Sequence, residues 1–232
     1  KTQVNEIYQT LQFIFSKAVE NNMISDNPAK NIIKPKFVKK NRRSITDSER
    51  HHLLAVSENN IRFLPFLIML YCGCRPSEVR ELKWQDIKNL DEVNVLHIKG
   101  TKTDNADRIV PIPDALFSIL RPSKPSDYIC LDLQGNKLNA DSFRRSARAL
   151  YRAMNVSMGC KVFRNALIPP LPLADDFVPY CLRHTYCTDL QKSGVDIRTA
   201  QYLMGHSSIA LTADIYTHAD QSIIKEAAKL LK

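Results

Sequence analysis

The spacing of apolar residues predicts a chain that is mostly helical. Residues 4–19 carry apolar side chains at helical intervals, namely Ile7, Leu11, Ile14, Phe15 and Ala18. Thr46 and Glu49 form a capping-box pattern that predicts a helix through residue 57, and Gly73 ends a second helix over residues 61–72. The same periodicity, with the same start and stop signals, predicts further helices over residues 76–82, 114–120, 139–154, 180–194, 196–204, 208–216 and 222–231.

Alternating apolar and polar positions predict a small sheet among these helices. Residues 93–98 alternate, residues 100–107 have the composition of a turn, and residues 108–112 form a second strand-like run. Pairing of the two runs gives an α+β fold that is mostly helical with a small antiparallel β-sheet. Residues 155–179 are irregular and rich in proline, so we expect a loop or hairpin insertion there, and its length suggests a functional role.

A basic, proline-containing segment divides the chain. It carries a run of cationic side chains, namely Lys34, Lys36, Lys39, Lys40, Arg42 and Arg43. This run is either a solvated connector or a strap over a DNA backbone. We therefore expect two parts, residues 1–43 and a larger domain over residues 44–232. Because the chain starts without Met and inside a helical pattern, we expect the first part to be the end of a longer domain.

Charge and cysteine content narrow the classes of function. The 33 Lys and Arg exceed the 24 Asp and Glu, and the net charge of +9 suits a polyanionic partner such as nucleic acid. The 6 Cys lack the spacing of a zinc site, and the sequence shows no carboxylate cluster typical of magnesium, so we expect neither a metal nor a cofactor. Reduced cysteines and the lack of a membrane-length apolar run indicate a cytoplasmic protein without a membrane partner.

Cationic side chains at turns are the first candidates for chemistry. Arg75 lies between a helix stop and a helix start, so it either presents its guanidinium group rigidly to a phosphate or is a surface arginine at a cap. Glu78 follows one turn later and either orients Arg75 or caps the helix. Lys102 lies in the turn of the predicted hairpin, where a lysine can donate a proton, although most turn lysines are merely solvated.

The last third of the chain supplies the remaining candidates. Tyr180 and Arg183 lie three positions apart and are predicted to share a helix face. His206 follows the helix stop at Gly205, and Tyr216 ends the next predicted helix. A phenol with a pKa near 10 is a poor nucleophile until cations or a base assist it. Three other side chains in this region are interpreted as core or interface residues: His184, Tyr186 and Tyr202.

Together these motifs resemble the tyrosine recombinases, or phage-type integrases, including those of conjugative transposons. The matches follow the family's order over nearly the whole chain: Gly73, Arg75, Ser77 and Glu78; Lys102, Arg108, Val110 and Pro111; Arg183 and His184; Met204, Gly205 and His206; and Tyr216. Tyr180 departs from the pattern, because the family usually has His there. Residues 1 to about 40 are similar to the last helix of the family's core-binding domain and the linker that follows it.

The resemblance implies site-specific recombination of double-stranded DNA, such as integration and excision of a mobile element, through a 3′-phosphotyrosine. It implies these roles: Tyr216 as nucleophile, Arg75 and Arg183 as phosphate ligands, Lys102 as proton donor to the leaving 5′ oxygen, and His206 and Tyr180 as hydrogen-bond donors to the phosphate. It also implies a homo-oligomer of two to four subunits on DNA, formed through the helix over residues 222–231, and DNA-bending accessory factors. A type IB topoisomerase and a non-catalytic DNA-binding module stay open as alternatives.

Overall fold

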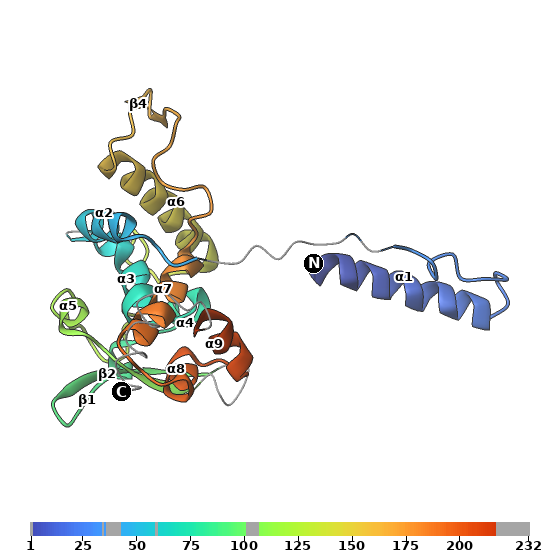
Figure 1. Ribbon diagram of the computed structural model, residues 1–232, viewed down its shortest axis with the longest axis horizontal. Helices are drawn as coiled ribbons and strands as arrows, with labels where there is room; N and C mark the ends of the chain where they lie inside the picture. The colour runs from blue at the N-terminus through green and yellow to red at the C-terminus, as the bar shows by residue number, and fades with distance from the viewer. Residues whose placement is uncertain (1, 34, 36–42, 59, 101–106, 217–232) are drawn as a thin grey trace, which may run out of the picture. The chain divides into compact units, whose positions relative to one another are not determined.

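The computed structural model describes residues 2–33, 35, 43–58, 60–100 and 107–216 (Figure 1). The chain divides into two compact units, Lys1–Asn41 and Arg42–Lys232. Within the first unit, α1 (Thr2–Glu20) confirms the first predicted helix. The turn that follows α1 folds back onto it, because Gln12 Nε2 donates to the carbonyl oxygen of Ala29 at 2.6 Å. The assignment of this unit to a core-binding domain stays a prediction.

The core of the second unit is built around one short apolar helix. In α3 (Leu64–Cys72) every residue but Tyr71 is buried, as expected of a helix that is apolar on all sides. It packs against α7 (Pro179–Lys192), while α2 (Asp47–Ser57) packs against α6 (Ala140–Ser157). The capping box of Thr46 and Glu49 at the start of α2 is confirmed. A 3₁₀ turn, η1 (Ile61–Phe63), leads into α3, so the predicted helix over 61–72 begins in a tighter form.

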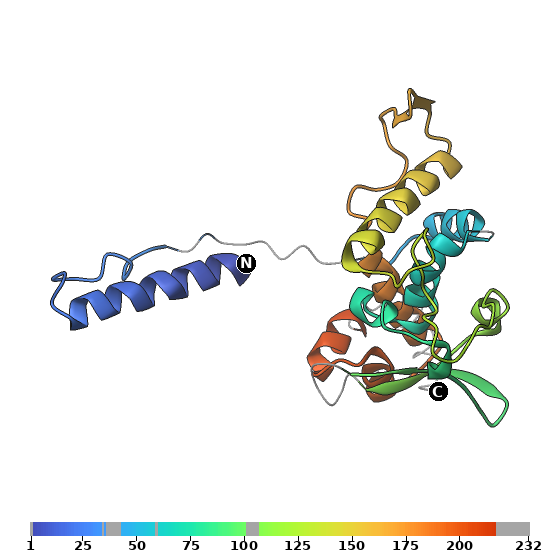
Figure 2. The ribbon, with the colours of Figure 1, turned by 180° about the vertical axis from the view of Figure 1, so that it is seen from behind.

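A three-stranded antiparallel sheet lies at one end of this unit, and α6 with its hairpin extends at the opposite end (Figures 1 and 2). The strands are β1 (Ile87–Leu90), β2 (Val93–Ile98) and β3 (Arg108–Pro111), in that order, with Leu96 opposite Val110. The structure confirms the pairing of the two predicted strands. Sequence reasoning missed β1, because this edge strand is mostly exposed and lacks the apolar alternation that marks a half-buried strand.

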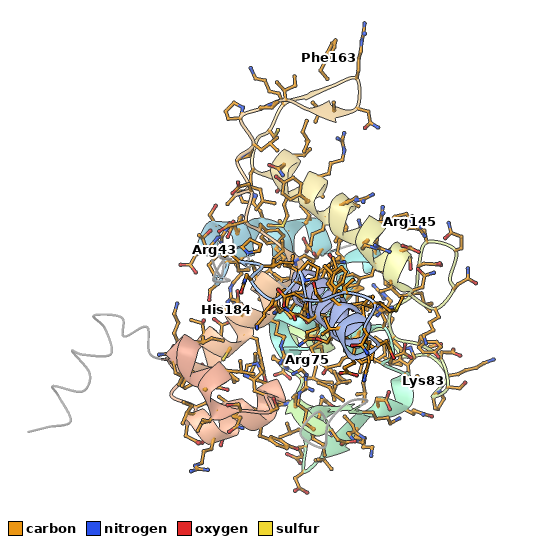
Figure 3. All side chains as sticks on the ribbon, turned by 90° about the vertical axis from the view of Figure 1, so that its right-hand side faces the viewer. Arg43, Arg75, Lys83, Arg145, Phe163 and His184 are labelled. Atoms are coloured by element: carbon orange, nitrogen blue, oxygen red, sulfur yellow. The ribbon has the colours of Figure 1, made fainter. Side chains whose placement is uncertain are left out.

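The segment predicted as an insertion is a helix end followed by a hairpin. The α6 helix starts after its N-cap Asn139, as predicted, but continues to Ser157. Beyond it, β4 (Val162–Phe163) and β5 (Ala166–Leu167) pair through a two-residue turn at Arg164 and Asn165, both of which have positive φ. Figure 3 shows Phe163 at the far end of this hairpin. The predicted helix over 114–120 is shorter, α5 (Asp114–Phe117), and is followed by a turn.

The remaining elements position the candidate site. They are α4 (Pro76–Val79), η2 (Trp84–Asp86), α8 (Ile197–Met204) and α9 (Ile209–Tyr216). The start of the second unit is fastened to α7, because Ile45 N donates to Thr185 Oγ1 at 2.9 Å and Ser44 Oγ lies 3.3 Å from His184 Nδ1. Among the described residues, the helices are too short or too polar to cross a membrane. The helix predicted over residues 222–231 lies outside the described residues.

Candidate active site

A sharp corner between α3 and α4 presents Arg75. The corner depends on Gly73, whose φ is +62° and whose missing Cβ would lie 2.2 Å from a ring carbon of Tyr186. Glu78 then fixes Arg75 from one turn away: its carboxylate accepts from the backbone N of Arg75 at 2.7 Å and from Arg75 Nη1 at 2.6 Å. In the view of Figure 3, Arg75 lies near the middle of the second unit. Glu78 therefore does both things that the sequence left open: it orients the guanidinium group of Arg75 and it caps the start of α4.

Three arginines converge on the C-terminus of α8. Arg108 Nε donates to the carbonyl oxygen of Leu203 at 2.9 Å, Arg183 Nη2 donates to that of Met204, and Arg75 Nη2 donates to that of Gly205 at 2.6 Å. Carbonyls at a helix C-terminus lack partners within the helix and carry the negative end of its dipole, so they suit cations. Arg183 also donates through Nη1 to the carbonyl oxygen of Gly73, which joins the two glycine turns.

The carboxylate of Glu78 lies within ion-pair distance of all three guanidinium groups. Glu78 accepts from Arg108 at 2.8 and 3.1 Å in addition to Arg75, and Arg183 Nη1 lies 4.0 Å from Glu78 Oε2. Although burial raises the pKa of Glu78, hydrogen bonds from Arg108 and Arg75 lower it to about 2. Burial and the neighbouring arginines lower the pKa of Arg183 to about 10, so it stays charged at neutral pH. Positive charge therefore exceeds negative charge in this cluster, as binding of an anion requires.

His206 borders the cluster as a neutral side chain. Burial and the charges of Arg183, Arg75 and Arg108 lower its pKa to about 4. Its Nδ1 lies 3.0 Å from Thr212 Oγ1, a buried hydroxyl on α9, which ties the turn after α8 to the helix that ends in Tyr216. At neutral pH the imidazole can donate or accept a hydrogen bond but adds no charge.

The hydroxyl of Tyr216 does not join the guanidinium groups of the cluster. Its hydroxyl donates to the carbonyl oxygen of Val195 at 3.1 Å, and its ring packs against a small cluster that includes Tyr186 and Met204. Burial raises its pKa to about 12, and the ionisable groups that add to this shift are Cys187 and Asp196 rather than an arginine. The structure therefore brings Arg75, Arg183 and His206 together and directs the Tyr216 hydroxyl to a backbone carbonyl.

Tyr180 and Lys102 complete the set of predicted residues. Tyr180 lies in the first turn of α7 and is 39% exposed, whereas Arg183 is 4% exposed, so the two differ in burial despite their spacing. Tyr180 lines an open cavity of about 310 Å³ with Pro76, the residue after Arg75, and is flanked there by Arg144 and Arg148 of α6. Lys102 lies outside the described residues.

Sequence reasoning assigned no role to Arg108, although its side chain is fully buried at the centre of the cluster. A signal was present, since Arg108 occupies an inward position of a strand in which burial alternates. Tyr186 is buried as predicted, but the interpretation of Tyr202 as core was wrong. Tyr202 is 51% exposed, and its hydroxyl accepts from the backbone N of Ile109 at 3.0 Å, because its polar end pairs with the edge of β3. Within the described ranges, no three His, Cys, Asp or Glu side chains are placed to hold a metal ion.

Comparison with known proteins places these features in one family. The profile of the phage integrase family matches residues 43–222. A tyrosine recombinase of Thermosipho africanus is 30% identical over 237 residues, which cover 99% of this chain and 76% of that protein. Tyrosine recombinase XerA of Pyrococcus horikoshii is 30% identical over 213 residues, which cover 89% of this chain and 67% of that protein.

Solved structures agree on the fold. The Tn1549 transposon integrase in complex with circular intermediate DNA matches with a TM-score of 0.70 at 20% identity, over 98% of this chain and 79% of that one. A lambda integrase dimer bound to a core site matches with a TM-score of 0.63 at 21% identity, over 92% of this chain and 60% of that one.

Proposed function

This chain belongs to the phage integrase family of tyrosine recombinases, and we propose that the arginine cluster around Gly205 is its phosphate-binding site and Tyr216 its nucleophile. The observation that carries the assignment is the excess of positive charge around one carboxylate, with Arg75 and Arg183 held by the carbonyls at the end of α8. These two guanidinium groups bind the non-bridging oxygens of the scissile phosphate and stabilise the charge of the transition state.

The other candidates take roles around this phosphate. Tyr216 releases its phenolic proton to water and attacks phosphorus in line, the bond to the 5′ oxygen breaks, and Lys102 gives a proton to that oxygen as it leaves. Neutral His206 donates a hydrogen bond to the phosphate, and the Tyr180 hydroxyl adds a second donor from the edge of the corner. The covalent 3′-phosphotyrosine conserves the energy of the phosphodiester bond, so a 5′ hydroxyl from another strand can rejoin the DNA.

The surface beside the corner supports double-stranded DNA as the partner. Arg144 and Arg148 flank the cavity that Tyr180 lines, so the positive charge continues from the corner onto α6. Cations on the rim of a site contact the phosphate backbone and make affinity dependent on salt. We propose that copies of the chain assemble on DNA through residues 222–231, with DNA-bending factors assisting, and that they act in the cytoplasm on a mobile element.

The experiment that tests this proposal traps the covalent intermediate. Nicked duplexes with randomised flanks are incubated with the chain, so that cleavage near the nick releases a short fragment and prevents religation. Adducts that survive denaturing detergent are sequenced to recover the site. We expect adducts with the wild-type chain and none with Tyr216→Phe. Adducts of equal yield from the Tyr216→Phe variant would refute the assignment of the nucleophile.

A second assay separates recombination from topoisomerase activity. Two plasmids that carry the recovered sequence are incubated together with the chain. Recombinant products are expected, whereas relaxation of supercoils without exchange would favour the topoisomerase alternative.

A further inference from the structure

Arg108 is more deeply buried than the two arginines proposed to bind the phosphate: its side chain is 0% exposed, compared with 4% for Arg183 and 29% for Arg75. Over the whole residue its exposure is 1%, and it is the largest of the fully buried side chains in the described part of the chain. Burying a cation is costly unless it is paired and hydrogen-bonded. Arg108 meets this requirement with Glu78, to which it donates at 2.8 and 3.1 Å, and with the carbonyl oxygen of Leu203 at 2.9 Å.

The partners of Arg108 lead directly to Arg75. The two carboxylate oxygens of Glu78 that accept from Arg108 are the same two that accept from the side chain and the backbone N of Arg75. A guanidinium fork that spans both oxygens fixes the plane of a carboxylate. The orientation of Arg75 therefore depends on Arg108 through Glu78.

Arg108 also affects the charge that Arg75 can offer. Without Arg108, the carboxylate of Glu78 would be hydrogen-bonded to Arg75, with Arg183 4.0 Å away, and would offset more of the charge of Arg75. With Arg108 present, the carboxylate is hydrogen-bonded to two arginines and lies 4.0 Å from Arg183, so Arg75 retains positive charge for an anion. The backbone beside Arg108 is held as well, because Ile109 N donates to the Tyr202 hydroxyl on α8.

We propose that Arg108 is a positioning residue for DNA cleavage, which holds Glu78 so that Arg75 faces the scissile phosphate with its charge available. This inference rests on the proposed function, since it assumes that Arg75 binds that phosphate. Arg108 itself touches no substrate.

The test compares two substrates with one conservative variant. Arg108→Lys keeps the charge but loses the fork that spans both oxygens of Glu78. Its rate of adduct formation is measured on the recovered site with an ordinary phosphodiester and with a methylphosphonate at the scissile position. A methylphosphonate has no negative charge, so it needs less help from correctly placed cations. Arg62→Lys is the matched control, because Arg62 bonds to Ser146 and to the backbone of Arg145, away from the cluster.

We expect Arg108→Lys to slow adduct formation by about 100-fold on the phosphodiester, since misplacing a catalytic group by about 1 Å has an effect of that size. On the methylphosphonate we expect the gap to wild type to shrink to about 3-fold or less, because loss of a cation's alignment matters mainly for a charged oxygen. Arg62→Lys should match wild type on both substrates. Melting temperatures show that each variant is folded at the assay temperature, and Arg108→Gln, which buries no cation, serves as a second variant with the same expected pattern.

Two results would overturn the positioning role. One is a wild-type rate for Arg108→Lys and Arg108→Gln on the phosphodiester. The other is an equal loss on both substrates, which would indicate a merely structural role. Failure of the proposed function can be told apart from failure of the positioning role alone. In that case the wild-type chain itself would form no adduct that depends on Tyr216, and the positioning role would be refuted as well.

Discussion

Gly205 occupies a place in the arginine cluster that no other residue fits. Its φ is +59°, in the left-handed region, and a Cβ added there would lie 2.8 Å from Arg108 Nη1 and 3.1 Å from two further atoms of that side chain. The guanidinium group cannot move aside freely, because Glu78 and the carbonyl oxygen of Leu203 hold it. Gly205→Ala therefore combines backbone strain with displacement of a buried cation.

The loss of folding stability expected for Gly205→Ala is the sum of these two effects. An L-residue in the left-handed conformation costs roughly 1–2 kcal/mol. Weakening a hydrogen bond between charged groups, here between Arg108 and Glu78, costs about 1.5–3 kcal/mol more. We expect Gly205→Ala to lower the free energy of unfolding by about 2.5–5 kcal/mol, a large share of the roughly 5–15 kcal/mol that stabilises a typical domain.

Gly194→Ala provides the matched control. Gly194 also follows a helix and has a φ of +75°, but an added Cβ would meet nothing within 4 Å. It should show only the backbone strain of about 1–2 kcal/mol. Urea unfolding followed by the fluorescence of the single Trp, Trp84, which packs against the core, measures both variants. Equal losses for the two variants would refute the reasoning that Arg108 is rigidly held against Gly205.

Three further predictions concern ionisation and the predicted donors. The pKa of Glu78 is about 2 in the folded chain rather than 4.5, so its ionised form stabilises the fold by about 3 kcal/mol above pH 4.5. This stabilisation is lost as the pH falls toward 2. In urea titrations from pH 2 to 6, the free energy of unfolding of Glu78→Gln should therefore depend less on pH than that of the wild type. The pKa of His206 is about 4 in the folded chain, so as the pH falls from about 6.5 the imidazole is protonated first in the unfolded chain. The free energy of unfolding therefore declines between about pH 6.5 and 4. NMR titration of the folded chain should show no midpoint near 6.5 for this imidazole. In the adduct assay, Tyr180→Phe should lose only a few-fold in rate, whereas Arg183→Ala should abolish activity; equal losses would show that the Tyr180 hydroxyl matters more than its exposed position suggests.

The boundaries that sequence alone predicted well are those set by local chemistry. The capping box at Thr46, the N-cap at Asn139 and the left-handed glycines at 73 and 205 each act within a few residues, so their patterns are visible in the sequence. The exposed strand β1 carries no such local pattern and was missed.

Arg108 shows why the arrangement of a site is harder to predict than its members. The carboxylate that it pairs with lies 30 residues away in the chain and the carbonyl lies 95 residues away, so no spacing rule links them. The interpretation of Tyr202 as a core residue was wrong for a similar reason. Its hydroxyl accepts from a backbone N of β3 that lies 93 residues away in the chain. Sequence motifs named most of the cluster, but its electrostatics depend on long-range pairs.

The direction of Tyr216 is compatible with its proposed role because the phenol is held by far fewer interactions than the arginines. The cations are fixed by Glu78 and by successive carbonyls at the end of α8, whereas the Tyr216 hydroxyl makes one hydrogen bond within the described part of the chain, at 3.1 Å to the carbonyl oxygen of Val195. Releasing this hydrogen bond costs about 1 kcal/mol, in addition to the packing of the ring against Tyr186 and Met204, and charge-assisted hydrogen bonds between a phosphate and two guanidinium groups offset this cost. On the proposed mechanism the arginine cluster is therefore the preformed part of the site, and Tyr216 is the part that moves when DNA binds. Near those cations its pKa would fall from about 12, because they stabilise the phenolate that burial now disfavours.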